Sequence, residues 1–310
     1  MTVALITHEA CLEHDQGPHH PERPDRLRAV WDALDAPEFA ALARERAPEA
    51  TVDQLARPHP RRYVEAVLEI RPDLGQRVQL DGDTAMSEGS ADAALRAAGA
   101  AVRGVDAVMD GTARRAFAAV RPPGHHAEPA RPMGFCLFNN VAVAAHRARD
   151  RWGLKRIAVV DFDVHHGNGT QAMFWDDPDL FYASSHQSPC YPGTGQPHET
   201  GVAGNIVNAP LPPRSGSAAF RAAWADTILP ALDAFAPELL IVSAGFDAHR
   251  DDPLAQLRVE TADFAWLTRE LRALAVRHCA GRLVSVLEGG YDLDALAECA
   301  AAHVRALMED

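Results

Sequence analysis

The 310-residue sequence is short of positive charge. Its 30 Lys and Arg residues are outnumbered by 43 Asp and Glu residues, so the formal net charge is −13 at pH 7. Because phosphate binding relies on clustered Lys and Arg, this balance argues against nucleic acid or an anionic membrane as a partner. Gly (21) and Pro (22) are too few for a collagenous or disordered chain, and 47% of the residues are apolar. The composition therefore indicates a globular protein with a full hydrophobic core.

The sequence also lacks paired cysteines and a leader-like start. Its five cysteines are odd in number, widely spaced and without a Cys-x-x-Cys pair, which argues against a disulfide framework or a zinc ribbon. The first apolar run is interrupted by His8 and Glu9, and no basic residue precedes it. It is typical of neither a secretory signal nor a membrane span. We expect a reducing, cytoplasmic setting.

What the sequence does contain is an alternation of short apolar runs with alanine-rich stretches of helical spacing. The runs predict strands at residues 4–7, 116–120, 157–163, 180–184, 205–209, 239–244 and 283–287. The stretches predict helices at residues 23–34, 60–70, 87–109, 141–152, 218–235, 261–278 and 293–308. Right-handed crossovers join such strands into one parallel sheet between two helical layers. This is an α/β fold, which we interpret as a single domain over residues 1–310.

Acidic and histidine side chains gather where the predicted strands end. Asp163 and His165 are two residues apart at the end of an apolar run, so strand alternation would place both on one side, and Asp161 shares that parity. Another run ends at Asp247. Two carboxylates and one imidazole with an open fourth position are typical of a hydrolytic metal site. A single Asp or His after a strand is more often a helix cap or a loop hydrogen-bonding residue than a metal ligand. Unpaired burial of several such groups is costly, however, which favours a shared cation.

A histidine pair and a tyrosine add to this pattern. His125 and His126 follow Pro-Pro-Gly, a sequence that can fix a sharp turn and so direct both imidazoles into one pocket. Beside a metal site, one imidazole suits a general base and the other a charge stabiliser, each oriented by an acceptor such as Asp161 or Asn168. Tyr291 follows two glycines, where its hydroxyl could approach an oxyanion, although a packing role fits this residue as well.

With these motifs in view, the sequence resembles the histone deacetylase superfamily, and its class II branch in particular. The segments that carry the resemblance are HHPERPDRL (19–27), RPPGHHAE (121–128), GFCLFNNVAVAA (134–145), DFDVHHGNGTQAMF (161–174), PGTG (192–195), VSAGFDAHRDDPL (242–254) and LEGGYDL (287–293). The resemblance implies the arginase/deacetylase fold, in which a central, mostly parallel eight-stranded sheet carries helices on both faces. It also implies a zinc-dependent hydrolase of N-acyl amides.

The resemblance assigns roles to individual residues. It implies zinc ligation by Asp163, His165 and Asp247. It implies His126 as general base and then acid, and His125 as its electrostatic partner. Asp161 would accept a hydrogen bond from His125, and Asn168 would accept one from His126. Tyr291 would donate to the substrate carbonyl and to the oxyanion.

Further residues are implied in substrate and ion binding. The Gly134 carbonyl would receive the substrate amide N–H, Phe135 and Tyr191 would flank a tunnel for the acyl-lysine stem, and Gly289 would also contact substrate. Leu254 would overlook the tunnel mouth, where relatives that act on polyamines carry Glu. The family also binds structural potassium, which implies one site at Asp161, Asp163, His165, Ser184 and Ser185 and a second at Phe174, Asp177 and Leu180.

Some positions depart from the family pattern. Tyr191 stands where many relatives have Phe, Gly89 where eukaryotic class II enzymes have a substrate-contacting Ser, and Ala255 where Gly is usual. The Ala- and Arg-rich composition indicates a bacterial source, which makes histones poor candidates for the natural substrate.

We weigh four functions. The first is removal of acetyl or other acyl groups from lysine in proteins or peptides, and the second is hydrolysis of acetylpolyamines or other small amides. The third, a non-catalytic acyl-lysine binder, is disfavoured by the complete set of catalytic residues. The fourth, an arginase-like dimanganese enzyme, is disfavoured because the segments lack the extra Asp for a second metal. One imidazole and two carboxylates can also hold iron(II) or cobalt.

Overall fold

Eight strands form the centre of the structure, a computed structural model that describes residues 2–309. Within those residues the strands are β1 (Val3–Thr7), β2 (Ala43–Arg46), β5 (Arg115–Ala118), β6 (Ile157–Asp161), β7 (Leu180–Gln187), β8 (Ile206–Leu211), β9 (Leu239–Ala244) and β10 (Leu283–Leu287). They lie in the order β2-β1-β5-β10-β9-β6-β7-β8, and every neighbouring pair is parallel. The predicted mostly parallel eight-stranded sheet is confirmed.

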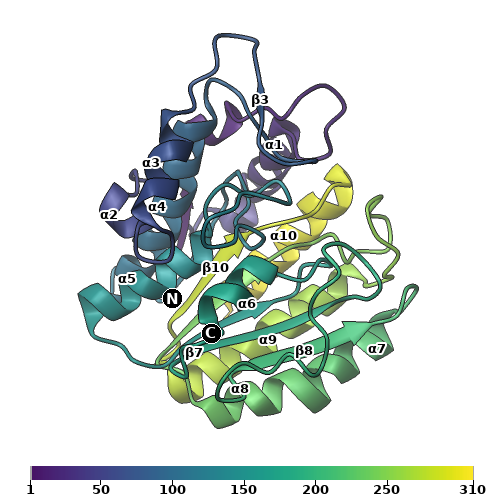
Figure 1. Ribbon diagram of the computed structural model, residues 1–310. Helices are drawn as coiled ribbons and strands as arrows, with labels where there is room; N and C mark the ends of the chain where they lie inside the picture. The colour runs from purple at the N-terminus through teal and green to yellow at the C-terminus, as the bar shows by residue number, and fades with distance from the viewer. Residues whose placement is uncertain (1, 310) are drawn as a thin grey trace.

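Helices cover both faces of this sheet (Figure 1). One face carries α4 (Ser90–Met109), α5 (Asn140–Trp152) and α6 (Asn168–Phe174), and the other carries α1 (Pro24–Leu34), α9 (Thr261–His278) and α10 (Leu293–Met308). Strand β10 shows the alternation: Val284 faces Gly104 of α4, while the hydroxyl of Ser285 meets His303 of α10 at 2.8 Å. Because both faces are covered, the strands consist of continuous apolar runs rather than alternating ones.

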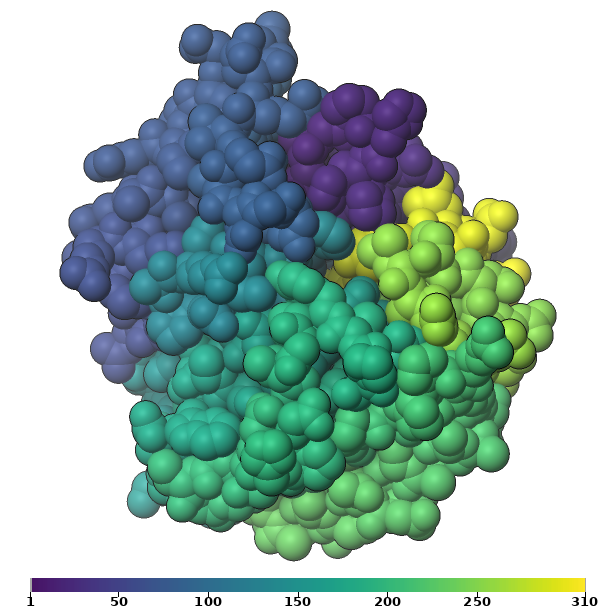
Figure 2. All heavy atoms as spheres, turned by 45° about the vertical axis from the view of Figure 1, so that its right-hand side comes forward, coloured from purple at the N-terminus to yellow at the C-terminus, as the bar shows by residue number. Residues whose placement is uncertain are grey.

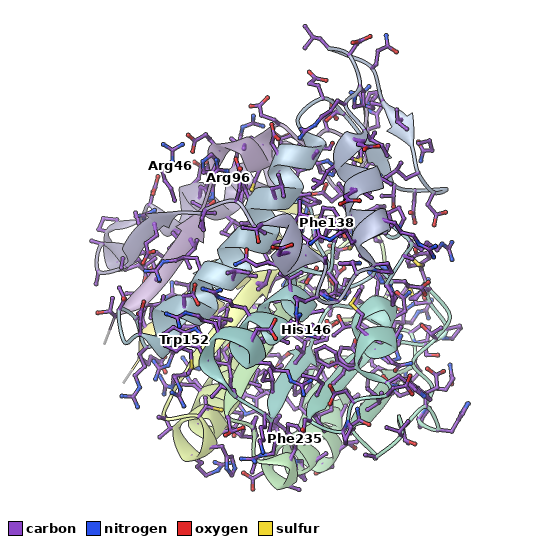
Figure 3. The ribbon with its side chains drawn as sticks, turned by 60° about the vertical axis from the view of Figure 1, so that its left-hand side comes forward. Arg46, Arg96, Phe138, His146, Trp152 and Phe235 are labelled. Carbon is purple, nitrogen blue, oxygen red and sulfur yellow. The ribbon has the colours of Figure 1, made fainter. Side chains whose placement is uncertain are left out.

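The remaining elements complete the two layers. They are α2 (Val52–Leu55), α3 (Arg61–Glu69), α7 (Ser217–Ala222), a π-helical turn (Ala223–Ile228), α8 (Leu229–Phe235), the 3₁₀ turns η1 (Glu9–Leu12) and η2 (Pro37–Phe39), and the hairpin β3 (Val78–Gln79) and β4 (Ala85–Met86). Phe138, labelled in Figure 3, belongs to a smaller apolar core shared by α3, α4 and α5, while the larger core surrounds the sheet. None of the helices in residues 2–309 combines the length and apolar character needed to cross a bilayer. The assignment of the whole chain to one domain remains a prediction.

Two predicted elements differ most from the structure, and one strand of the sheet was not predicted. The strand expected at residues 157–163 ends at Asp161, so Asp163 and His165 belong to the loop that follows it. The helix expected at 218–235 is divided by the π-helical turn. Strand β2 was not predicted, because its sequence Ala-Arg-Glu-Arg is polar and its residues alternate between half-buried and exposed at the edge of the sheet.

Candidate active site

The carboxyl ends of four adjacent strands carry the predicted functional residues. In sheet order these strands are β5, β10, β9 and β6. His125 and His126 lie beyond β5, Tyr291 beyond β10, and Asp247 beyond β9, while the loop after β6 holds the Asp163–His165 pair. Because parallel strands end at the same edge of a sheet, residues from across the sequence meet there.

Asp163, His165 and Asp247 form a buried cluster suited to a cation. Each offers one potential ligand atom, and these atoms all lie within 4.8 Å of one another. The His165 Nδ1 atom is 3.2 Å from Asp163 Oδ1 and 3.1 Å from Asp247 Oδ2. One nitrogen and two carboxylate oxygens at this separation fit a divalent ion that prefers N and O ligands.

Backbone N–H groups orient the two carboxylates. The Val164 N–H donates to Asp247 Oδ1 at 2.8 Å, and the Gly289 N–H donates to Asp163 Oδ2 at 2.8 Å. Gly289 must be glycine here, because a Cβ atom on it would lie 2.2 Å from Asp247 Oδ2. Gly289 therefore packs against both carboxylates and is not among the residues that line the pocket, and its contact with substrate remains a prediction.

The charges of the cluster are interdependent. Burial acts to raise the pKa of Asp163, but the imidazoles of His125 and His165 outweigh burial and lower it below its usual range. Burial and the Asp163 charge raise the pKa of Asp247 to about 7. Burial acts to lower the pKa of His165, but hydrogen bonds to both carboxylates raise it well above its usual value. The cluster thus has a strong demand for positive charge, which a bound cation would satisfy.

His125 forms a hydrogen bond with a buried carboxylate. Its Nδ1 atom is 2.9 Å from Asp161 Oδ2, which also accepts a hydrogen bond from the Tyr182 hydroxyl at 3.1 Å. Burial acts to lower the pKa of His125, but the charges of Asp161 and Asp163 outweigh it and raise the pKa to about 10. His125 is therefore an imidazolium at neutral pH.

His126 forms a hydrogen bond with an amide side chain instead. Its Nδ1 atom is 2.8 Å from the side-chain oxygen of Asn168. Burial, together with the charges of His125 and His165, lowers the pKa of His126 well below its usual value. The ring packs against Gly134, whose φ of 57° and missing Cβ allow a contact that any side chain would block. His126 is therefore a neutral imidazole.

The turn that carries the two histidines is held by a second buried carboxylate. Glu288 accepts hydrogen bonds from the backbone N–H groups of Gly124 at 2.6 Å and His125 at 3.2 Å. Burial raises the pKa of Glu288 to about 7. Glu288 thereby connects the end of β10 to the Pro-Pro-Gly turn.

A pocket of about 250 Å³ opens above these groups. It is lined by Asp83, His126, Phe135, His165, Tyr191, Leu254 and Tyr291. Tyr191 and Leu254 remain 39% and 38% exposed, so they lie toward the mouth. On the face shown in Figure 2, N-terminal residues (purple) adjoin the segment near residue 250 (yellow-green) and the C-terminal segment (yellow), so residues distant in sequence share this surface.

Tyr291 is held on one wall of the pocket. Its ring lies edge-to-face with Phe135 at 5.9 Å between centroids, and the buried guanidinium of Arg26 lies 4.8 Å from the ring centroid. The Tyr291 N–H donates to Asp252 Oδ2 at 2.7 Å. Burial raises the pKa of the Tyr291 phenol well above its usual value, so the hydroxyl keeps its proton and can donate it in a hydrogen bond.

Other expected residues have different partners. The Gly134 carbonyl accepts a hydrogen bond from the Cys136 thiol, with the sulfur and oxygen atoms 3.2 Å apart. Asp161 pairs in register with Ser184 across β6 and β7. The Ser185 hydroxyl oxygen instead accepts a hydrogen bond from Trp224 Nε1 at 2.9 Å.

The carbonyls expected at a second potassium site do converge on one point. The Asn205 Nδ2 atom occupies that point and shares its two protons among the carbonyls of Phe174 at 2.9 Å, Asp177 at 3.1 Å and Leu180 at 2.9 Å. These three oxygens are therefore already paired within the protein. The two potassium sites remain predictions.

Several acidic residues of the site were not predicted. They are Asp83, Glu128, Asp252 and Glu288. Glu128, Asp252 and Glu288 lie within the quoted motifs as unassigned acids, and a carboxylate next to Gly-Gly, two residues after His-His or in Asp-Asp-Pro-Leu is the signal that could have identified them.

Comparisons with known proteins agree with this geometry. The histone deacetylase domain matches residues 20–307. Histone deacetylase 10, chloroplastic, from Oryza sativa subsp. japonica is 41% identical over 308 residues, covering 93% of this chain and 70% of the rice protein. The histone deacetylase-like amidohydrolase of Pseudomonas aeruginosa is 39% identical over 311 residues, covering 93% of this chain and 81% of that protein. The crystal structure of the HDA15 HD domain superposes with a TM-score of 0.92 at 37% identity, covering 99% of this chain and 88% of that one.

Proposed function

Because this chain belongs to the histone deacetylase family and is a hydrolase of that family, we propose that it removes acetyl or other acyl groups from lysine side chains of proteins or peptides, with zinc as the catalytic metal. The pocket carries the proposal: aromatic walls, a neutral imidazole and His165 of the buried Asp-His-Asp cluster line one narrow space. Asp163, His165 and Asp247 would hold the zinc. When bound, zinc would supply a Lewis acid that polarises the scissile carbonyl and acidifies water.

His126 is the proton acceptor in this mechanism. A neutral imidazole beside the pocket can take a proton from the attacking water and later give it to the leaving amine. His125 cannot serve as base at neutral pH because it already carries its proton. Its fixed positive charge balances the carboxylates beneath it.

Tyr291 is the proposed donor to the oxyanion. Its phenol keeps its proton, and the residue lines the same pocket as His126. The hydrogen bond strengthens as negative charge develops on the carbonyl oxygen, so it contributes mainly in the transition state. Phe135 and Tyr191 would enclose the alkyl stem of the substrate.

Three finer assignments belong to the same proposal. Asn168 in place of Asp beneath His126 is similar to class II enzymes. A cytoplasmic, bacterial setting is supported by five unpaired cysteines and the Ala- and Arg-rich composition. Structural potassium near Asp161 is proposed from the family resemblance alone.

One observation favours a second candidate, a hydrolase of acetylpolyamines or similar small amides. The Asp83 side chain lines the pocket and would attract a cationic substrate. Leu254 speaks against it, because an apolar residue at the mouth leaves a secondary ammonium without a partner and suits a peptide instead.

The test compares kcat/KM for an acetyl-lysine peptide with that for N-acetylputrescine and N8-acetylspermidine. We expect the wild type to favour the peptide and Leu254→Glu to shift the preference toward the polyamines. Leu254→Gln is the matched control, because it has the size and polarity of Glu without its charge. Wild-type preference for polyamines, or the same shift in the Gln and Glu variants, would replace the peptide assignment with the amidohydrolase one.

A further inference from the structure

The amide of Asn168 can face His126 in only one orientation. Its two ends look alike in shape, but one accepts hydrogen bonds and the other donates them. On the side away from His126, its neighbours are Glu128 Oε1 at 2.9 Å and Met133 Sδ at 3.4 Å. Both neighbours are acceptors, so the amine must point at them and the carbonyl oxygen must point at His126.

That orientation determines where the proton of His126 resides. A carbonyl oxygen only accepts, so the Nδ1 atom at 2.8 Å must be the protonated nitrogen of the neutral ring. The other nitrogen, Nε2, then carries the lone pair on the opposite side of the ring. Because His126 lines the pocket, that lone pair is available there.

We infer that Glu128 is a positioning residue that selects, through Asn168, the ring tautomer in which His126 can accept a proton. This inference rests on the proposed function, in which His126 is the base. Glu128 itself is half-buried and does not line the pocket. A flipped amide would turn its oxygen toward the Glu128 carboxylate and its amine toward Nδ1, and the ring would then carry its proton on the nitrogen that faces the pocket.

The carboxylate has a function only while residue 168 is an amide. An Asp at this position presents an oxygen whichever way it turns, so it needs no orienting partner. Glu128 would instead repel it at close range. Removal of the Glu128 carboxylate should therefore lower kcat when residue 168 is Asn but not when it is Asp.

The experiment measures kcat and KM of Glu128→Ala alone and in the Asn168→Asp background. In the wild-type background we expect kcat to fall about tenfold, as for loss of other orienting partners, with KM unchanged. In the Asn168→Asp background we expect no fall. Asp81→Ala is the matched control, because Asp81 is a nearby carboxylate paired with Arg131 that does not contact Asn168. An equal loss of kcat in both backgrounds would show a merely structural role and overturn the inference.

A second measurement reads the tautomer directly. Nitrogen-15 shifts of labelled histidine in the full chain distinguish a protonated from an unprotonated ring nitrogen, and the His126 signals are those that vanish in His126→Gln. We expect Nδ1–H in the wild type and a mixture in Glu128→Ala. An unchanged Nδ1–H tautomer in Glu128→Ala overturns the inference whatever the activity. If the wild type does not hydrolyse acyl-lysine, the proposed function is wrong. The tautomer measurement still tests the inference about Glu128 in that case.

Discussion

His125 and His126 are neighbours in sequence, and their ring centroids are 4.0 Å apart, yet the two sides of this pair are built differently. The His125 side ends in Asp161, a fully buried carboxylate, and the His126 side ends in the amide of Asn168. Burial acts to lower the pKa of both rings, but only His125 has a carboxylate directly on its Nδ1 atom to reverse the effect. Two identical side chains thus reach opposite charge states through their hydrogen-bond partners and the charges around them.

The largest expected effect on activity comes from disrupting the metal site that lies beside both histidines. Asp247→Ala deletes one of the three potential ligands, so bound zinc should be lost and hydrolysis should fall to background, because too few ligands remain to hold the ion. Metal analysis of the purified variant checks this. Asp252→Asn is the control, since Asp252 is also buried nearby but holds the Tyr291 N–H; it should keep its zinc. Full zinc content in Asp247→Ala would remove this residue from the site.

Asp161→Asn makes the His125 side resemble the His126 side. It leaves a buried imidazole without its charge partner, and we expect a loss of about 3 kcal/mol in the free energy of unfolding. Chemical denaturation measures it. Tyr182→Phe, which removes the other hydrogen bond to the same Asp161 oxygen and the acceptor of the Gly167 N–H, should cost about 1 to 2 kcal/mol. Equal costs for the two variants would mean that His125 is not charged.

Tyr291→Phe decides which group meets the oxyanion. If Tyr291 is the donor, kcat should fall about 100-fold with metal content and fold preserved. If the His125 charge stabilises the oxyanion instead, kcat should hardly change. Tyr63→Phe is the control, because its hydroxyl donates to the Leu137 carbonyl, away from the pocket. A raised KM with unchanged kcat would assign Tyr291 to substrate binding in the ground state.

The smallest effect concerns a histidine remote from the site. His303 is fully buried between the hydroxyls of Thr268 at 2.7 Å and Ser285 at 2.8 Å, and burial alone lowers its pKa to about 3. The unfolded chain binds this proton below about pH 6.5, whereas the folded protein does not. Stability should therefore decrease as pH falls through that window, by up to about 1.4 kcal/mol per pH unit for this group.

His303→Gln should remove that contribution. The free energy of unfolding would then depend less steeply on pH between about pH 5 and pH 6 than in the wild type. An identical slope in the two proteins would show that burial without a carboxylate does not keep an imidazole neutral in this fold. His303 would then no longer support the explanation that burial without a carboxylate partner keeps His126 neutral.

Much of the sheet followed from the sequence because its strands are continuous apolar runs. All seven predicted strands overlap observed ones, among them β6, β9 and β10 in the centre. The missing strand, β2, has no apolar run, since an edge strand half-exposed to water needs none. It is recognised only from its parallel pairing with β1, for example Ala4 with Ala43.

Much of the site could be listed from the sequence, but its geometry was partly predicted for the wrong reason. Asp163 and His165 were expected to converge through strand alternation. They converge because the loop after β6 folds back, with the His165 N–H donating to Asp163 Oδ1 at 2.9 Å. Local spacing showed which residues to consider, and the loop conformation placed them.

The sequence by itself determined seven of the eight strands of the sheet, the types of side chain at its carboxyl edge and the family to which the chain belongs, because these depend on local composition and on long motifs. Apart from the Asp161–His125 pair, which the resemblance implied, only the tertiary structure decided which carboxylate supports which group. Glu288 holds the turn at Gly124 from 164 residues away, and Glu128 reaches Asn168 across 40 residues. The charge of an imidazole and the direction of an amide depend on such long-range neighbours and on exclusion of water, and neither is encoded in the spacing of residues along the chain.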